Sequence, residues 1–169
     1  SPRAPCGPAT KSPSSRRWQA AESMRTAMVD HPLDPAALLA EVSSTESGAS
    51  TLFVGTVRRV NDGKDVTGID YSAYGPMAES ELATIASEAA ARFGTSRIAV
   101  EHRLGTLTLG EASIIIAVSH ARRAAAMDAQ RFLIEEIKKR VPVWKREHYA
   151  DGSREWVDPT AVVLAGGAA

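Results

Sequence analysis

Residues 122–142 read RRAAAMDAQRFLIEEIKKRVP, and this stretch carries the strongest helix signal in the chain. Its apolar side chains recur at the spacing of an α-helix. They are Ala126, Leu133, Ile137 and Val141. Proline lacks a backbone N–H and clashes with the preceding helical turn, so Pro142 ends the segment. The pattern predicts a helix over 122–140.

The segments on both sides of this helix predict a mixed fold. Downstream, strands over 143–149 and 154–157 flank Asp151-Gly152, which is typical of a β-hairpin turn. The elements expected upstream are a helix over 34–42, strands over 50–57 and 66–74, a helix over 76–94, strands over 97–104 and 112–120, and a bend or short strand at 105–110. This order lacks the regular alternation of a doubly wound sheet. We therefore predict an α+β fold with a mixed, largely antiparallel sheet, about three helices and a C-terminal hairpin.

Composition excludes several classes of protein. The 169 residues carry 20 basic and 20 acidic side chains, so net charge gives no sign of nucleic-acid or membrane binding. The single cysteine, Cys6, excludes an intrachain disulfide framework and a cysteine-based zinc site. No apolar run reaches the roughly 18 residues of a membrane span. Glycine-rich phosphate loops and the HExxH and GxSxG motifs are absent, and the histidines show no metal-ligand spacing. We expect a cytoplasmic protein without metal or cofactor.

The two ends of the chain differ from its middle. Residues 1–30 contain five basic side chains against two acidic ones and are rich in Ser, Pro and Ala. We interpret residues 1–32 as a disordered tail, although an Arg- and Ser-rich segment of this kind also occurs in organelle transit peptides. The folded domain is expected over 33–158, followed by a flexible tail over 159–169.

Basic side chains gather between residues 122 and 146. They are Arg122, Arg123, Arg131, Lys138, Lys139, Arg140, Lys145 and Arg146. Such a cluster suits a small anionic substrate or an acidic protein tail, and the alternative is a solvated helix face. Two of these residues have apolar neighbours in sequence, Lys138 beside Ile137 and Lys145 after Trp144. Lost solvation lowers the pKa of a lysine, so we expect these two to be catalytic candidates.

Five blocks of sequence resemble one family. Residues 138–147 read KKRVPVWKRE, which matches the pattern K-x-x-x-P-x-W-K-[KR]-E. The other blocks are FVGTVR at 53–58, YSAYGPM at 71–77, HRLGTL at 102–107 followed by Gly110-Glu111, and Asp151-Gly152 followed by Trp156-Val157. In this order and spacing they resemble the MoaE family, the large catalytic subunits of molybdopterin synthases. The resemblance covers about residues 33–158 and implies a MoaE-like fold of the α/β-hammerhead type.

The resemblance implies a sulfurtransferase. Enzymes of this family convert cyclic pyranopterin monophosphate to molybdopterin by building a dithiolene into it. Each sulfur arrives as a thiocarboxylate on the C-terminal Gly-Gly of a small ubiquitin-like, MoaD-like subunit. The family assembles as a heterotetramer around a homodimer of large subunits. Because Cys6 lies in the expected tail, the folded domain has no cysteine of its own, which agrees with sulfur that arrives on a partner.

The resemblance also implies roles for individual residues. Lys138 corresponds to the catalytic lysine nearest the incoming thiocarboxylate. Lys145 and Arg58 are expected to bind the phosphate or to stabilise developing negative charge, with Lys145 also counted as catalytic. Without the resemblance, the sequence favours an ordinary surface arginine at the end of a strand for Arg58. Phe53 is expected either in the pocket wall or in the core.

Two arginines at the start of the helix are further candidates for substrate binding. Arg123 and Lys138 differ by about 60° around a helix and lie roughly 22 Å apart along it, too far for one small pocket. If both are functional, Arg123 must reach the pocket of a neighbouring subunit. Arg122 stands where the family usually has histidine. An arginine replaces a phosphate-binding histidine but cannot replace a proton donor, because guanidinium stays protonated.

Two other functions remain open from the sequence. One is a catalytically impaired relative that only binds a ubiquitin-like partner, which the exchange at Arg122 favours. The other is a nucleic-acid-binding module that uses the basic helix, which zero net charge and 5% aromatic residues disfavour.

Overall fold

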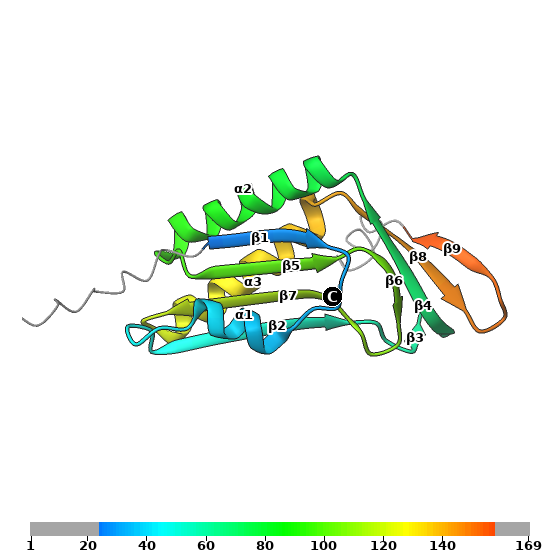
Figure 1. Cartoon of the computed structure of the whole chain (residues 1–169), viewed down its shortest axis with the longest axis horizontal. Coiled ribbons are helices and arrows are strands. Elements are labelled where there is room, and N and C mark those ends of the chain that lie inside the picture. The colour runs from blue at the N-terminus through cyan, green and yellow to red at the C-terminus, as the bar shows by residue number, and fades with distance from the viewer. Residues whose placement is uncertain (1–23, 158–169) are drawn as a thin grey trace, which may run out of the picture.

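The computed structural model describes residues 24–157, which form two sheets and three helices (Figure 1). The first sheet has the strand order β1-β5-β7-β2. Its strands are β1 (Met24–Val29), β5 (Ile98–Arg103), β7 (Ala112–His120) and β2 (Ala49–Thr56). β1 runs parallel to β5, and the other neighbours are antiparallel. The prediction of an α+β fold with a mixed, largely antiparallel sheet is confirmed.

The second sheet lies beyond one end of the first (Figure 1). Its strands are β3 (Val60–Asn61), β4 (Lys64–Ala73), β8 (Val143–Tyr149) and β9 (Arg154–Val157), and β6 (Gly105–Thr108) pairs with β4. β8 and β9 are the predicted C-terminal hairpin. The sequence left open a bend or a short strand at 105–110. In the structure residues 105–108 form the short strand β6, and residues 109–110 form a turn.

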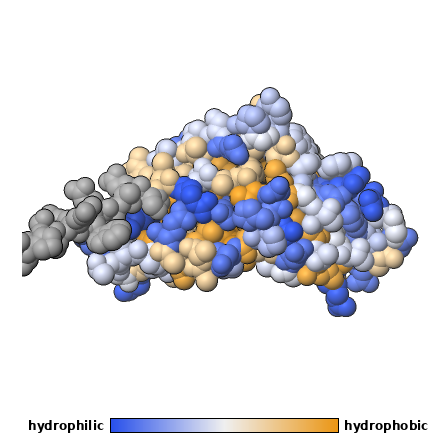
Figure 2. Space-filling model, viewed as in Figure 1, coloured by the Kyte–Doolittle hydropathy of each residue, from blue (hydrophilic) through white to orange (hydrophobic). Residues whose placement is uncertain are grey.

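Helices cover both faces of the first sheet. α2 (Gly75–Phe93) and α3 (Arg123–Arg140) lie on one face, and α1 (Pro35–Val42) lies on the other (Figure 1). α3 buries Leu133 and Ile137 against the sheet, as its apolar spacing predicts. Full burial of one such side chain stabilises the fold by roughly 1.5–3 kcal/mol. The surface around α1 mixes hydrophobic with hydrophilic side chains (Figure 2).

Local signals set the helix ends. The carboxylate of Asp34 accepts hydrogen bonds from the amides of Ala36 and Ala37 over 3.0 and 3.1 Å, which satisfies two free donors at the start of α1. α2 ends at Gly94, whose φ of 71° is left-handed and favours glycine. α3 ends at Arg140, two residues before Pro142, and this places Lys138 in its last turn.

The boundary predicted at residue 33 is wrong, because residues 24–29 form β1. The segment has no alternating apolar pattern, but it pairs along its whole length with β5. Arg25, counted as part of a basic tail, is held by Glu41 at 2.8 Å and by Glu101 at 2.7 Å. These ion pairs connect β1 to α1 and β5, so the charge of Arg25 stabilises the fold. The predicted tails over 1–23 and 159–169, with Cys6, lie outside the described residues.

The two sheets meet near the C-terminal end of α3. β2 leads out of the first sheet toward β3 and β4, and α3 leads through Pro142 into β8. This arrangement brings residues from both sheets and from α3 to one place, where the site lies. Within residues 24–157, no helix is long and apolar enough to cross a membrane.

Candidate functional site

A cavity of about 340 Å³ opens where α3 meets the two sheets. Its apolar lining comes from α3, the loop that follows and both sheets, and its polar lining comes from both sheets, the β2–β4 connection and the end of α3. The apolar lining residues are Ile114, Ile134, Ile137, Val141, Val143 and Val157, and the polar ones are Arg58, Asn61, Asp62, Tyr71, His102, Ser113, Lys138 and Lys145. The volume suits a small organic ligand with few polar groups to orient it.

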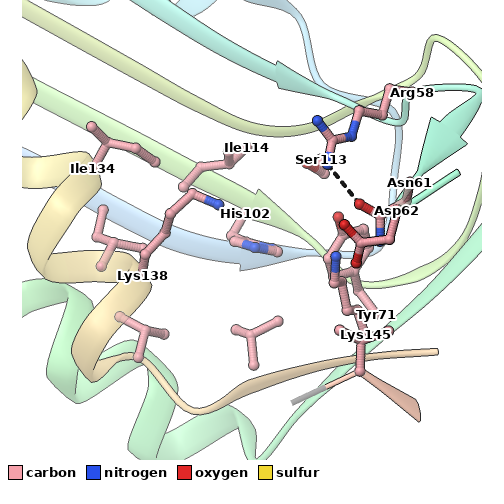
Figure 3. Close-up of a pocket in the computed structure, with 14 residues that line it drawn as sticks. Arg58, Asn61, Asp62, Tyr71, His102, Ser113, Ile114, Ile134, Lys138 and Lys145 are labelled. Atoms are coloured by element: carbon pink, nitrogen blue, oxygen red, sulfur yellow. Dashed lines mark hydrogen bonds between the residues drawn. The ribbon is translucent and has the colours of Figure 1, made fainter. Parts of the chain in front are cut away.

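Three cationic side chains reach this cavity from different elements. Arg58 follows β2, Lys138 lies in the last turn of α3, and Lys145 lies on β8. In Figure 3, Lys138 extends from one side, whereas Arg58 and Lys145 lie across the cavity from it. Charges spread around a cavity in this way can bind two anionic groups of one ligand, or anions from two ligands.

A buried carboxylate organises one side of the cavity. Glu147 on β8 is 1% exposed, and its oxygens accept hydrogen bonds from Lys145 over 3.0 Å, Asn61 over 2.9 and 3.0 Å and Tyr149 over 2.9 Å. Burial alone raises the pKa of Glu147, but these donors outweigh it and leave the pKa below its usual value. Asn61 accepts a hydrogen bond from Arg58 over 2.6 Å (Figure 3). Glu147 therefore positions Lys145 directly and Arg58 through Asn61.

A buried histidine lies in the cavity between the two groups of cations (Figure 3). His102 at the end of β5 is 8% exposed, and its ring packs edge-on against Tyr71 with centroids 5.4 Å apart. Burial is the main reason that its pKa falls to about 4; the hydrogen bond to the carbonyl of Arg103 opposes this, and the charge of Lys138 adds to it. His102 is therefore neutral at pH 7, and the positive charge of Lys138 favours this neutral form.

The structure gathers four of the predicted site residues and separates two. Arg58, Lys138 and Lys145 share the cavity, and Phe53 lines an adjoining hollow that the same three residues also line. Phe53 also packs against the main core, so its position is consistent with either of the two expected roles. Arg122 and Arg123 are exposed at the other end of α3 and do not line the cavity.

The start of α3 keeps the spacing expected from the sequence. β7 stays in register with β2 as far as His120, and the ring of His120 accepts a hydrogen bond from the amide of Arg122 over 2.8 Å. No bulge moves His120 into the position of Arg122. A shift of His120 therefore does not explain the departure from the family pattern that the resemblance implies at Arg122.

The two lysines that the sequence singled out differ in burial and in their partners. Lys138 is exposed, whereas the Lys145 side chain is 26% exposed and paired with Glu147. Apolar neighbours in the sequence did not predict the burial of Lys138, because Ile137 points into the core and Lys138 points out of it. Lys138 has no ion pair within residues 24–157, so its charge is available to a ligand.

The basic cluster over 122–146 does not form one cationic face. Half of its eight members are paired with carboxylates on different elements. These pairs are Lys139 with Glu136, Arg140 with Glu81 and Glu88, Lys145 with Glu147, and Arg146 with Asp70. This dispersal argues against a nucleic-acid surface, which needs free charges along one stripe.

Sequence reasoning missed the polar residues that complete the cavity. Asn61, Tyr71, Ser113 and Glu147 come from strands or turns that converge only in the folded chain. His102 stood within the HRLGTL block, but the histidines were judged only by metal-ligand spacing. Its position directly after a buried strand run was the signal that could have identified it.

Comparisons with known proteins agree with this geometry. A family model described as MoaE protein matches residues 28–140. The molybdopterin synthase catalytic subunit of Emericella nidulans is 42% identical over 126 residues, which are 75% of this chain and 65% of that protein. The one from Bacillus subtilis is 40% identical over 126 residues, 75% of this chain and 80% of that protein. The chain thus spans slightly less than two thirds of the fungal relative.

A solved structure gives the same result for the fold. The crystal structure of molybdopterin synthase from Staphylococcus aureus superimposes with a TM-score of 0.73 at 31% identity. The similarity covers 78% of this chain and 96% of that one. The resemblance noted in the sequence therefore extends to the arrangement of both sheets.

Proposed function

Because the chain belongs to the MoaE family, we propose that it is the catalytic subunit of a molybdopterin synthase. It would transfer sulfur from the C-terminal thiocarboxylate of a small ubiquitin-like subunit to cyclic pyranopterin monophosphate. The observation that carries the proposal is the convergence of Arg58, Lys138 and Lys145 on one cavity with an apolar wall. Two anions must meet in this reaction, the substrate phosphate and the thiocarboxylate.

The three cations would bind different anions, because their surroundings differ. Lys145 and Arg58 are fixed through Glu147 and Asn61, which suits them to hold the phosphate in one orientation. Lys138 is exposed and unpaired within the described chain, which suits it to receive the mobile C-terminus of a partner and to stabilise negative charge on the reacting sulfur. The aliphatic wall beside Lys138 would support the pterin ring and exclude water.

Sulfur has to come from outside the described domain. Residues 24–157 contain no cysteine, so no thiol of the described residues can carry sulfur to the substrate. A thiocarboxylate on a flexible C-terminal Gly-Gly supplies it without a cysteine in this chain. Only a narrow, extended tail fits a cavity of about 340 Å³ that the substrate also occupies.

We also propose that two copies pair through β2 and share their sites. β2 is an edge strand of the first sheet, and its Leu52 and Val54 are 37% and 36% exposed. A bare apolar edge favours pairing with another strand. The start of β2 lies beside the end of β7 and so near Arg123, whereas its end leads to Arg58 and the cavity.

Antiparallel pairing of two such strands would bring opposite ends together. The eight residues of β2 span about 27 Å, similar to the roughly 22 Å between Arg123 and Lys138 along α3. Arg123 of the partner subunit would then lie near this chain's cavity. In such a dimer Arg122 and Arg123 could bind substrate in the partner's cavity, which they cannot reach within one chain.

Reconstitution tests the proposed function. The full chain is mixed with a ubiquitin-like protein ending in a Gly-Gly thiocarboxylate and with cyclic pyranopterin monophosphate, and molybdopterin is measured. The matched control carries an ordinary C-terminal carboxylate. We expect product only with the thiocarboxylate. Binding of both ligands without product would instead support the catalytically impaired relative, and absence of binding would contradict both. A cytoplasmic location stays a prediction.

A further inference from the structure

His102 has the geometry of a proton acceptor inside the cavity. Its Nδ1 lies 3.0 Å from the carbonyl oxygen of Arg103, so in the neutral ring Nδ1 carries the proton and donates it there. The lone pair is then left on Nε2. Within residues 24–157, Nε2 has no hydrogen-bond partner, while the ring lines the cavity (Figure 3).

The other polar groups of the cavity are poorly suited to accept a proton. Arg58, Lys138 and Lys145 are cations. Glu147 already accepts hydrogen bonds from Lys145, Asn61 and Tyr149 and is 1% exposed. Asp62 also reaches the cavity, but it sits on an exposed turn at a positive φ of 47° and is open to solvent.

The proposed reaction requires such an acceptor, and the inference rests on that proposed function. When the sulfur of a thiocarboxylate attacks a carbon of the substrate that bears oxygen, a new carbon–sulfur bond forms, the carbon–oxygen bond breaks, and the oxygen leaves as water after protonation. Partner and substrate are then joined as a thioester. Freeing the sulfur requires water to attack the acyl carbon. That water must lose a proton as the new C–O bond forms, and the leaving sulfur needs one as the C–S bond breaks.

We propose that His102 is the general base and acid for this hydrolysis. Nε2 takes a proton from the attacking water, the C–O bond forms, the C–S bond breaks, and the imidazolium returns the proton to the leaving thiolate. The partner departs with an ordinary carboxylate after the second proton of the water passes to solvent, and no group is oxidised or reduced. The negative charges of the bound phosphate and of the sulfur offset the positive charge that His102 gains beside Lys138.

The position of the ring supports this role. Tyr71 packs against one side of it and the Arg103 carbonyl fixes its tautomer, so the ring cannot turn to place Nε2 elsewhere. Lys138, which would hold the thiocarboxylate, is near enough for its charge to act on the ring. Acyl carbon, water and base would therefore meet on the same side of the cavity.

A single-turnover experiment with the full chain and thiocarboxylated carrier tests the proposal. His102→Asn keeps a donor for the Arg103 carbonyl but has no group at the place of Nε2, and His102→Gln is a second variant in case the first does not fold. Loss of a general base predicts a fall in molybdopterin formation of about 10²-fold. The carrier–substrate adduct should accumulate and be detected by intact mass. His31→Asn makes the same substitution at an exposed histidine that does not line the cavity; it is the matched control and should react like the wild type. Asp62→Asn tests the other carboxylate that reaches the cavity.

The outcomes separate two failures. A wild-type protein that makes no molybdopterin contradicts the proposed function itself. If the wild type turns over, two results for folded His102 variants contradict the role of His102 alone. One is full rate, and the other is a loss of rate without accumulation of the adduct. Accumulation of the adduct in Asp62→Asn would transfer the role to Asp62 and equally overturn the proposal.

Discussion

Lys145 donates a hydrogen bond over 3.0 Å to Glu147, a carboxylate that is 1% exposed, and this pair links the cavity to the stability of the second sheet. Lys138, seven residues earlier in the chain, has no such partner within the described residues. Two lysines that look alike in the sequence therefore differ in what their removal should do.

Lys145→Ala should reduce both stability and activity. It leaves Glu147 buried with fewer donors, which costs roughly 1–3 kcal/mol of the free energy of unfolding. Urea unfolding measures this loss, and Lys64→Ala, which removes an exposed pair with Glu155, is the control and should change stability little. Equal stability of Lys145→Ala and wild type would mean that the network around Glu147 does not stabilise the sheet.

Lys138→Ala should abolish activity and leave the fold intact. The side chain is exposed, so its removal changes few packing contacts, whereas loss of a positioned charge at a reacting group costs about 10²–10³-fold in rate. The matched control is Lys139→Ala, because Lys139 is the next residue and pairs with Glu136 on the helix surface. A similar loss of sulfur transfer in both variants would indicate a general effect of charge.

The sequence was sufficient to predict most helices and strands but not the residues that line the cavity. Apolar spacing placed α3, and the turn at Asp151-Gly152 placed the hairpin, because both patterns are local. β1 was missed because a strand whose pairing partner lies about 70 residues away needs no pattern of its own. Glu147 was read only as the end of a motif, since nothing local shows that Asn61 and Tyr149 converge on it.

Acid should destabilise the protein through carboxylates that accept hydrogen bonds. The amide and hydroxyl of Thr108 and the guanidinium of Arg103 lower the pKa of Glu111 to about 2, with the amide of Thr108 the largest cause. A lowered pKa in the folded state stabilises the fold above the ordinary glutamate pKa, and this stabilisation is lost as pH falls toward 2. Between about pH 5 and about pH 2, the free energy of unfolding measured in urea should depend less on pH for Glu111→Gln than for the wild type. An unchanged dependence would contradict the assignment.

Arg122→His restores the residue usual in the family and tests what that position does. We expect the rate of sulfur transfer to change by less than about threefold, because arginine binds phosphate at least as well as histidine. The rate and KM for the pterin substrate are measured separately. A large gain in rate at unchanged KM would show that a proton donor is missing at Arg122, and would support the catalytically impaired relative.

Arg123 should act in the site of the neighbouring copy. Arg123→Ala and Lys138→Ala should each be nearly inactive alone, because every site of either homodimer lacks one residue. When the two variants are unfolded and refolded together, half of the chains should enter mixed dimers, and each mixed dimer has one site with both residues intact. Activity should therefore recover to about a quarter of the wild-type value. If mixed dimers are detected by mass but activity does not recover, Arg123 and Lys138 act in the same site or Arg123 takes no part in the reaction. Either result would remove the functional argument for pairing through β2.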